Sequence, residues 1–139
     1  MEDQWEKLIR EIEGEIWQDF SETVKEHVRN PKNVGQIKDA DGYAYLQGQC
    51  GDSIQIWVKV KEGIIEDIKF WTDGCGTTIA SGSMITELAR GKKLEEALSI
   101  TPLILLEAMG GLPEDSEHCA ILATNTLHEA IKDYQRKNH

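Results

Sequence analysis

The sequence predicts an α+β fold: a three-stranded antiparallel sheet packed by helices on one side, with an extra helix at the N-terminus. Three observations support this fold class. Alternation of apolar and polar residues is confined to residues 43–72, helical spacing of apolar residues follows over residues 77–136, and a separate helical stretch precedes Pro31. Strands that come first and helices that come afterwards indicate a layer of helices on one antiparallel sheet.

The chain has the length and composition of one globular domain. Its 139 residues are 40% hydrophobic and 29% charged, which suffices for one core that needs no disulfide. We expect residues 1–139 to form a single domain, in which residues 1–19 are an acidic helical extension.

The N-terminal stretch has helical spacing and an acidic bias. Its apolar residues recur every three or four positions over residues 5–28, and Pro31 ends the helix because the residue before a proline is pushed out of the helical conformation. Ser21 could cap a second helix, so the stretch can break near Asp19. Residues 1–26 hold nine acidic and three basic side chains, which fits either a solvated helix face or a docking patch for a basic partner.

Three strands are predicted next. Residues 43–47 form a short strand, and the apolar residues within 54–60 alternate with polar or exposed ones, as is typical of a half-buried strand. After a short turn, residues 64–72 return the chain with Ile68 and Phe70 on one face. Because the turn between them is so short, the two longer strands are antiparallel.

A helix is predicted over about residues 77–90. Its expected inward stripe is Ala80, Met84 and Leu88, which lie four residues apart. Gly91 stands where helices commonly end.

Three further helices complete the predicted layer. Residues 94–98 form a short one, and Thr101-Pro102 starts another by placing an N-cap residue before a proline at the first helical position. The last helix spans about residues 117–136 and carries its apolar residues, with Cys119 among them, on one side.

Net charge and hydropathy argue against two classes of partner. The 15 basic and 25 acidic residues give a net charge of −10, which disfavours binding to nucleic acid or to an anionic membrane. The longest aliphatic run, residues 103–106, is far shorter than the roughly 20 residues that span a bilayer. The acidic N-terminus carries no targeting signal, so we expect a cytoplasmic protein.

Three cysteines give the first chemical indication. Cys50 lies in a glycine-containing loop between strands, Cys75 lies between two glycines before a helix, and Cys119 lies in the first turn of the last helix. Both helix starts favour a thiolate, because the helix dipole and the free N–H groups stabilise negative charge. In a reducing compartment such thiols stay available for metal binding or catalysis.

Three thiolates with one further ligand, Asp52 or His118, would form a tetrahedral site. Soft thiolates select zinc, copper(I) or iron–sulfur species. The separations of 25 and 44 residues match no zinc ribbon or zinc knuckle, so three unrelated structural cysteines are an alternative at this point. Likewise, His118 alone fits a capping histidine, and Asp52 alone fits a turn residue that caps its own backbone.

Four segments stand in a characteristic order: residues 30–35, which read Asn-Pro-Lys-Asn-Val-Gly, then Cys50-Gly51-Asp52, Gly74-Cys75-Gly76 and His118-Cys119. With these segments, the sequence resembles the IscU/NifU-N family of iron–sulfur cluster assembly scaffolds over about residues 20–134. The resemblance implies a protein that accepts sulfur as persulfide from a cysteine desulfurase and combines it with iron. It then transfers a labile 2Fe–2S cluster to apo-proteins, and is therefore an assembly scaffold rather than a classical enzyme.

The resemblance also assigns roles to individual residues. It makes Cys50, Cys75 and Cys119 the cluster thiolates, Asp52 the exchangeable oxygen ligand and His118 an alternate ligand. Cys119 is the expected sulfur acceptor. Zinc can occupy the same residues in the cluster-free form, and ferredoxin-like and frataxin-like proteins are further expected partners.

The chain departs from the family pattern before His118, where Leu112-Pro113-Glu114-Asp115-Ser116 replaces Leu-Pro-Pro-Val-Lys. This change weakens the expectation that the family's dedicated Hsp70 chaperone recognises it. Trp71 replaces a lysine that is usual in the family. Two alternative functions stay open: a SufU-like, zinc-dependent sulfurtransferase accessory and a structural zinc domain.

Overall fold

The computed structural model describes Gln4, residues 20–49 and residues 51–137. The helical extension predicted for residues 1–19 lies outside this part of the chain, apart from Gln4, and so does Cys50.

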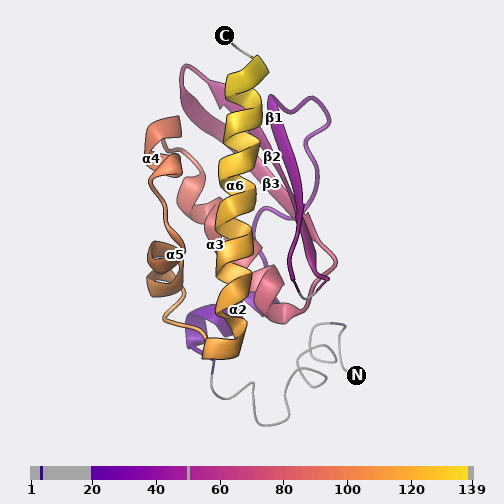
Figure 1. Ribbon diagram of the computed structural model, residues 1–139, viewed down its shortest axis with the longest axis vertical. Helices are drawn as coiled ribbons and strands as arrows, with labels where there is room; N and C mark the ends of the chain where they lie inside the picture. The colour runs from indigo at the N-terminus through magenta and orange to yellow at the C-terminus, as the bar shows by residue number, and fades with distance from the viewer. Residues whose placement is uncertain (1–3, 5–19, 50, 138–139) are drawn as a thin grey trace.

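One antiparallel sheet forms the frame of the fold (Figure 1). Its strands, in spatial order, are β1 (Gly42–Gln47), β2 (Ser53–Lys61) and β3 (Ile64–Thr72). The predicted meander is confirmed: Ile56 of β2 pairs with Ala44 of β1 on one side and with Phe70 of β3 on the other. All three side chains are buried, so this row crosses the core face of the sheet.

The helices of the described part are α2 (Glu22–Arg29), α3 (Gly76–Ala89), α4 (Leu94–Leu98), α5 (Pro102–Ala108) and α6 (Glu117–Lys137), with a 3₁₀ turn, η2 (Glu114–Ser116), before α6. The long α6 packs on β1 and β2, and α3 lies beside α6 on β3 (Figure 1). The predicted helical layer on one face of the sheet is therefore confirmed. No helix of the described part is both long and apolar enough to cross a membrane.

Two helix starts form at the predicted capping residues. Ser21 caps α2, because its Oγ accepts a hydrogen bond of 3.1 Å from the backbone N–H of Val24, and the same hydroxyl donates to the carbonyl of Met109. Thr101 caps α5 in the same way, with Pro102 at the first helical position. The bond from Ser21 to Met109 also joins the start of α2 to the end of α5.

The predicted inward stripe of α3 packs on the core, but it is only part of the buried surface of this helix. Ala80 is fully buried, but Met84 and Leu88 are only half-buried, whereas Ile85 and Ala89 are fully buried. α3 contacts β3, α2 and α6, so most of its circumference is enclosed. A helix that is buried on several sides has no single apolar stripe for the sequence period to reveal.

β3 also carries an irregularity that simple alternation does not predict. The pairing register of β2 and β3 shifts between Lys59 and Val60. As a result, Ile65 is fully buried while Ile64 is 39% exposed. Ile68, three residues after Ile65, is the next fully buried residue of β3.

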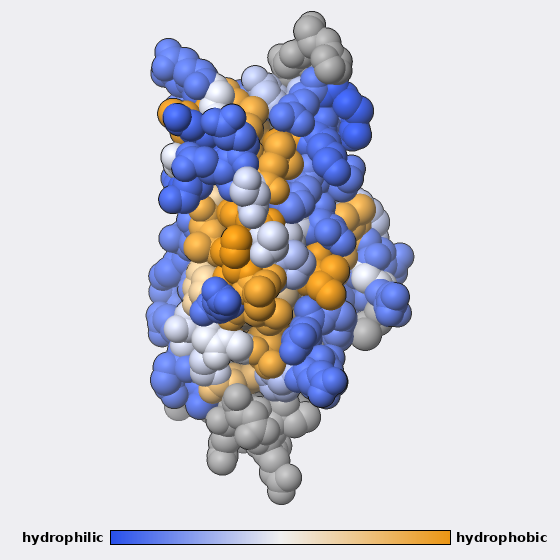
Figure 2. Space-filling view, turned by 60° about the vertical axis from the view of Figure 1, so that its left-hand side comes forward, coloured by the Kyte–Doolittle hydropathy of each residue, from blue (hydrophilic) through white to orange (hydrophobic). Residues whose placement is uncertain are grey.

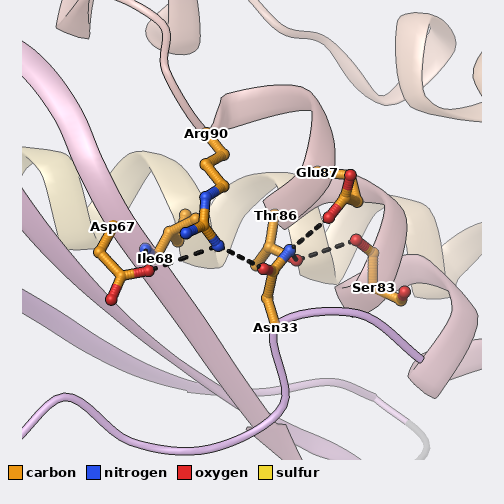
Figure 3. Close-up of polar contacts among 7 residues, drawn as sticks. All are labelled: Asn33, Asp67, Ile68, Ser83, Thr86, Glu87 and Arg90. Carbon is orange, nitrogen blue, oxygen red and sulfur yellow. Dashed lines mark hydrogen bonds and ion pairs between the residues drawn. The ribbon is translucent and has the colours of Figure 1, made fainter.

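A side-chain network holds the loop between α2 and β1 against α3 (Figure 3). Asn33, whose φ of 62° lies in the left-handed region, donates through its amide to Thr86 Oγ1 at 3.1 Å and to Glu87 Oε1 at 3.0 Å. Arg90 donates to Asn33 Oδ1 at 2.9 Å and lies 3.5 Å from Asp67 Oδ1. The loop is thereby attached to both α3 and β3.

The same loop covers the outer edge of β3. Val34 forms a parallel bridge with Phe70, in which Phe70 donates to the carbonyl of Asn33 and Gly35 donates to the carbonyl of Phe70, both at 2.9 Å. Backbone groups of an exposed edge strand are in this way satisfied within the chain. Val34 itself stays 43% exposed beside the strand.

Candidate metal centre

Asp52, Cys75 and Cys119 meet where α3 and α6 begin, at one end of the molecule (Figure 1). Asp52 directly precedes β2, Cys75 directly precedes α3, and Cys119 is the third residue of α6. One carboxylate oxygen of Asp52 and the two Sγ atoms all lie within 4.8 Å of one another. Side chains from three separate elements thus form one potential ligand group.

The three donors differ in exposure. Cys119 is 2% exposed, Asp52 is half-buried and Cys75 is exposed. Cys75 is the extended N-cap residue of α3, so its sulfur lies near the unpaired N–H groups of the first helical turn. The group is therefore anchored in the core at Cys119 and open to solvent at Cys75.

Thr78 links the three donors to one another. Its hydroxyl donates a hydrogen bond of 2.8 Å to Asp52 Oδ2, and it lies 3.7 Å from Cys75 Sγ and 3.4 Å from Cys119 Sγ. Thr78 is fully buried, so this hydroxyl has a fixed place. It acts as a positioning residue, because it orients the ligand atoms without being a preferred ligand itself.

Gly74 permits this close approach. A Cβ at this position would lie 2.8 Å from Thr78 Cβ and 2.9 Å from Asp52 Oδ2. Both distances are too short for any larger residue without a shift of the neighbouring atoms. The glycine before Cys75 is therefore required by the packing of Thr78 and Asp52 against the loop.

A second carboxylate, that of Asp73, connects the loops that carry Asp52 and Cys75. Asp73 Oδ1 accepts hydrogen bonds from the backbone N–H and the hydroxyl of Ser53, at 2.8 and 3.0 Å. These bonds lower the pKa of Asp73. The bonds between Ser53 and Asp73 therefore hold the loop that carries Asp52 beside the loop that carries Cys75.

His118 lies next to this group. It belongs to the first turn of α6, and its Nε2 is 3.6 Å from Cys119 Sγ. With Gly48 and Gln49 it lines a cavity of about 310 Å³ between the β1–β2 loop and α6. His118 is therefore placed beside a ligand atom, while Cys50, the residue after Gln49, lies outside the described residues.

The two described thiols have opposite acidities. A hydrogen bond with the Cys119 thiol, supported by the N–H groups and hydroxyl of the first turn of α3, lowers the pKa of Cys75 to about 5. The same contact, together with burial, raises the pKa of Cys119 far above its usual range. The contact between the two thiols therefore favours a thiolate at Cys75 and a protonated thiol at Cys119.

This donor set suits a thiophilic metal or cluster. Two sulfur atoms and one carboxylate oxygen fit zinc or iron better than magnesium or calcium, which prefer oxygen alone. Of the predicted ligands, the structure brings Asp52, Cys75 and Cys119 together and places His118 beside them. The sequence reasoning missed Thr78, although a threonine three residues after a helix-capping cysteine lies on the same face of the first turn.

Known proteins are similar to this chain in sequence. Residues 19–139 match the family described as the NifU-like N terminal domain, so the chain belongs to this family. It is 52% identical over 120 residues to "Iron-sulfur cluster assembly scaffold protein IscU 1" of Archaeoglobus fulgidus, covering 86% of this chain and 78% of the relative. It is 42% identical over 123 residues to "Iron-sulfur cluster assembly scaffold protein IscU" of Escherichia coli, covering 85% of this chain and 95% of the relative. The predicted resemblance to the IscU/NifU-N family is confirmed.

A solved structure has the same architecture. The N-terminal part of a nitrogen-fixing NifU-like protein from Brucella abortus superposes with a TM-score of 0.68 over 84% of this chain and 94% of that chain. At 18% sequence identity this similarity establishes the fold. The predicted α+β class is confirmed on that ground as well.

Proposed function

We propose that this chain is a scaffold for iron–sulfur cluster assembly, which builds a cluster at Asp52, Cys75 and Cys119 and passes it to other proteins. The observation that carries the proposal is the mixed donor set, with two sulfur atoms and one carboxylate oxygen within 4.8 Å and an open side at Cys75. Membership of a family whose relatives are named as such scaffolds supports it.

The ligand chemistry suits cargo that must be released. Thiolates hold iron–sulfur clusters firmly, whereas a carboxylate is a harder and weaker ligand for them. With Cys75 and Cys119 as thiolates, Asp52 would supply the exchangeable position, and Cys50 would complete the set. His118, 3.6 Å from Cys119 Sγ, would be the alternate ligand. The cargo in this proposal is a 2Fe–2S cluster.

Sulfur would enter as a persulfide on Cys119. The Cys119 thiol gives its proton to a base, for which His118 Nε2 at 3.6 Å is placed, and the resulting Cys119 thiolate attacks the terminal sulfur of a persulfide on a cysteine desulfurase. The sulfur–sulfur bond on the desulfurase breaks, its cysteine leaves as a thiolate, and Cys119 carries the persulfide. Cys75 competes for this role because it is exposed and its lowered pKa favours the thiolate.

Cluster formation also needs electrons. Two persulfide sulfur atoms take up four electrons to become sulfide, and two ferrous ions supply two of these when they become ferric. The remaining two must come from a one-electron donor, for which a ferredoxin-like protein is suited. A frataxin-like partner and apo-protein acceptors complete the proposed set of partners, and the expected compartment for them is the cytoplasm.

An apolar surface close to the centre fits docking of such a partner. Figure 2 shows an apolar patch on the side of the molecule that carries α4 and α5. In α5, Leu103 is 63% and Ile104 is 44% exposed. A hollow of about 390 Å³ beside them is lined by Leu103, Leu112 and Glu117, among others, and Glu117 is two residues before Cys119. We place the docking of the desulfurase on this surface.

A zinc-dependent, SufU-like sulfurtransferase accessory is the second candidate. The same two thiolates and carboxylate could hold zinc with one further ligand, since zinc accepts sulfur and oxygen donors in a tetrahedral arrangement. A purely structural zinc domain would use the same residues but would neither accept sulfur nor release metal.

The experiment that separates these functions measures iron, zinc and acid-labile sulfide per chain. The protein is incubated without oxygen with a cysteine desulfurase, cysteine and ferrous iron, and is then desalted. Near-equal iron and sulfide would support the scaffold. Zinc that is retained without sulfide, under conditions in which a known scaffold loads, would contradict it and favour sulfur transfer.

A further inference from the structure

We propose that the outer edge of β1 binds an extended segment of a partner protein, which adds to the sheet as a fourth strand and places an aliphatic side chain in the cavity beside His118. The inference goes beyond the proposed function, because it assigns a docking site for a partner of defined chemistry. It can be tested in protein that holds neither metal nor sulfur.

The two edges of the sheet differ. The outer edge of β3 is covered within the chain by the loop that carries Val34. β1, in contrast, pairs with β2 alone in the part of the chain that the structure describes. Its sequence contains no charged residue and no proline, which are the residues that commonly protect an edge strand. The edge of β1 is therefore suited to pairing with another strand.

Main-chain groups of β1 point alternately toward β2 and away from it. The N–H of Gly48 donates to the loop before β2 at 2.7 Å, whereas the N–H of Tyr43 donates to Asp133 Oδ2 of α6 at 3.0 Å. By this alternation the N–H and C=O of Tyr45 and the N–H of Gln47 point outward. Among the described residues, none of these groups bonds to a loop or a helix, so they are available to an added strand.

α6 lies directly beneath β1. A Cβ on Gly42 would lie 2.3 Å from the carbonyl oxygen of Ala130, and a Cβ on Gly48 would lie 3.2 Å from a methyl carbon of Leu122. The strand and the helix therefore run in opposite directions along each other. α6 forms the floor beside the outer edge of the strand.

A cavity of about 310 Å³ opens between this edge and α6, next to the metal centre. Its lining includes Leu46, Ile121 and Leu122, together with His118. Ile121 is 48% exposed. A strand added to β1 directs every second side chain toward α6, so the side chain opposite Leu46 enters this cavity. An aliphatic side chain is favoured there, because it removes the apolar lining from water.

The charge of the chain sets a further requirement. The side chain opposite Ala44 points toward the part of α6 that carries Glu129 and Asp133, which lie four residues apart on one helix face. Both carboxylates also pair with lysines of α6, at 3.6 and 2.9 Å, so the chief attraction comes from the net charge of −10. This charge favours a basic segment and disfavours an acidic one.

A second copy of this chain does not fit the same edge. Paired strands lie about 4.8 Å apart, whereas two packed helices need about 8–10 Å between their axes. Because α6 lies directly beneath β1, pairing of two β1 strands would bring two α6 helices too close together. Two chains of net charge −10 also repel each other. The occupant is therefore an extended segment with no helix beneath it, as in other cases of strand addition to a sheet edge.

The test uses the metal-free full chain and the probe peptide acetyl-Thr-Leu-Tyr-Lys-Thr-amide. In an antiparallel pairing this peptide has its leucine opposite Leu46, its tyrosine opposite Tyr45 and its lysine opposite Ala44. NMR measures hydrogen exchange of the Tyr45 amide. At saturating peptide we expect this exchange to slow by about tenfold or more, because the amide then donates to the peptide.

Two methylated peptides separate strand addition from apolar contact. A methyl group on the tyrosine nitrogen removes the N–H that faces the C=O of Tyr45, and should abolish the slowing. A methyl group on the leucine nitrogen, which faces away from β1, should leave most of it. Equal slowing by the two methylated peptides would overturn the proposal, and so would the absence of slowing by the unmodified peptide.

Matched variants test the place of the aliphatic side chain. Ile121→Ser should weaken peptide binding by about fivefold or more, because the cavity loses apolar lining. Ile64→Ser alters another exposed isoleucine, at the start of β3, and should bind the peptide like the unaltered protein. Equal affinities of the two variants would overturn the proposal.

Protection of the Tyr45 amide that rises with protein concentration, without peptide, would overturn the proposal too, since a second copy would then occupy the edge. None of these measurements needs a cluster, so failure of the proposed function would leave them unchanged.

Discussion

The hydroxyl of Thr78 donates a hydrogen bond of 2.8 Å to the carboxylate of Asp52, and this bond joins the first turn of α3 to the loop before β2. Both described cysteine sulfur atoms lie within 3.7 Å of the same hydroxyl. Thr78 is fully buried and is not itself a preferred metal ligand. It therefore sets the relative positions of the three potential ligands Asp52, Cys75 and Cys119.

Replacing Thr78 by valine tests this role. Thr78→Val keeps the shape of the side chain but leaves Asp52 without its donor, so we expect zinc affinity, measured by chelator competition, to fall about tenfold or more. The unfolding free energy should fall by about 1 kcal/mol. Thr78→Ser keeps the hydroxyl and should restore most of the affinity. Zinc binding by Thr78→Val equal to that of the unaltered protein would contradict the assignment.

The acidity of Cys75 predicts an unusual pH dependence of its alkylation. Only the thiolate reacts, so the rate rises with pH through the pKa of the folded protein, and for Cys75 the rise should be centred near pH 5. Cys119→Ala removes the hydrogen-bonding thiol and should move this midpoint to higher pH. Iodoacetamide labelling of the metal-free protein, read by mass spectrometry of the Cys75 peptide, measures both. A midpoint near that of an ordinary cysteine, about pH 8.5, would refute the prediction.

Asp52 is predicted to limit the lifetime of the bound cluster. Asp52→Ala removes the hard, exchangeable oxygen ligand, so the loaded protein should lose its visible absorbance in air more slowly than the unaltered protein. Asp39→Ala is a suitable control, because Asp39 is an exposed carboxylate paired with Lys59 and lies outside the centre. An equal or faster loss of absorbance in Asp52→Ala would show that Asp52 does not have this role.

Gly74 offers a test that separates damage to the centre from damage to the fold. Gly74→Ala would bring a methyl group to 2.9 Å from Asp52 Oδ2, and Gly82→Ala would bring one to 2.5 Å from the Phe70 ring. We expect both to lower the unfolding free energy by about 1–3 kcal/mol. Only Gly74→Ala should also reduce iron and sulfide loading per chain beyond its loss of folded protein. Equal loading by the two variants would argue against a packing role of Gly74 at the centre.

Cys119 is predicted to be the sulfur acceptor. After incubation with a cysteine desulfurase and cysteine, the unaltered protein should carry one added sulfur atom on the peptide that contains Cys119, and Cys119→Ser should carry none. Intact-mass and peptide mass spectrometry without reductant detect the difference. Unchanged sulfur labelling of Cys119→Ser would transfer the role to Cys75 or Cys50.

Elements with local signals could be predicted from the sequence. The cap at Ser21, the Thr101-Pro102 start and the alternation around Ile56 each act over a few residues, and each has the predicted place in the structure. The predicted stripe of α3 packs on the core, but the full burial of Ile85 and Ala89 could not be predicted, because neighbouring elements enclose other faces of this helix. Burial on several sides is a tertiary property that a period does not encode.

The candidate centre, too, could be predicted from the sequence only in part. Glycine-flanked Cys75 and the His118-Cys119 pair marked it in the sequence, whereas Thr78 acquires its role only when α3, α6 and the loop before β2 meet. The acidity of the two thiols likewise depends on their contact across the fold, which an argument from the helix starts alone does not include. Local rules assign charge preference to a position, but a neighbouring thiolate can reverse it.

Transfer of the assembled cluster tests the central claim most directly. The protein is loaded without oxygen by a cysteine desulfurase, cysteine and ferrous iron, separated from free iron and sulfide, and mixed with an apo-ferredoxin. A scaffold predicts that iron and acid-labile sulfide leave this chain together and appear in the ferredoxin. Iron and sulfide that stay on this chain while the ferredoxin remains empty, although free iron and sulfide can load it, would contradict the account.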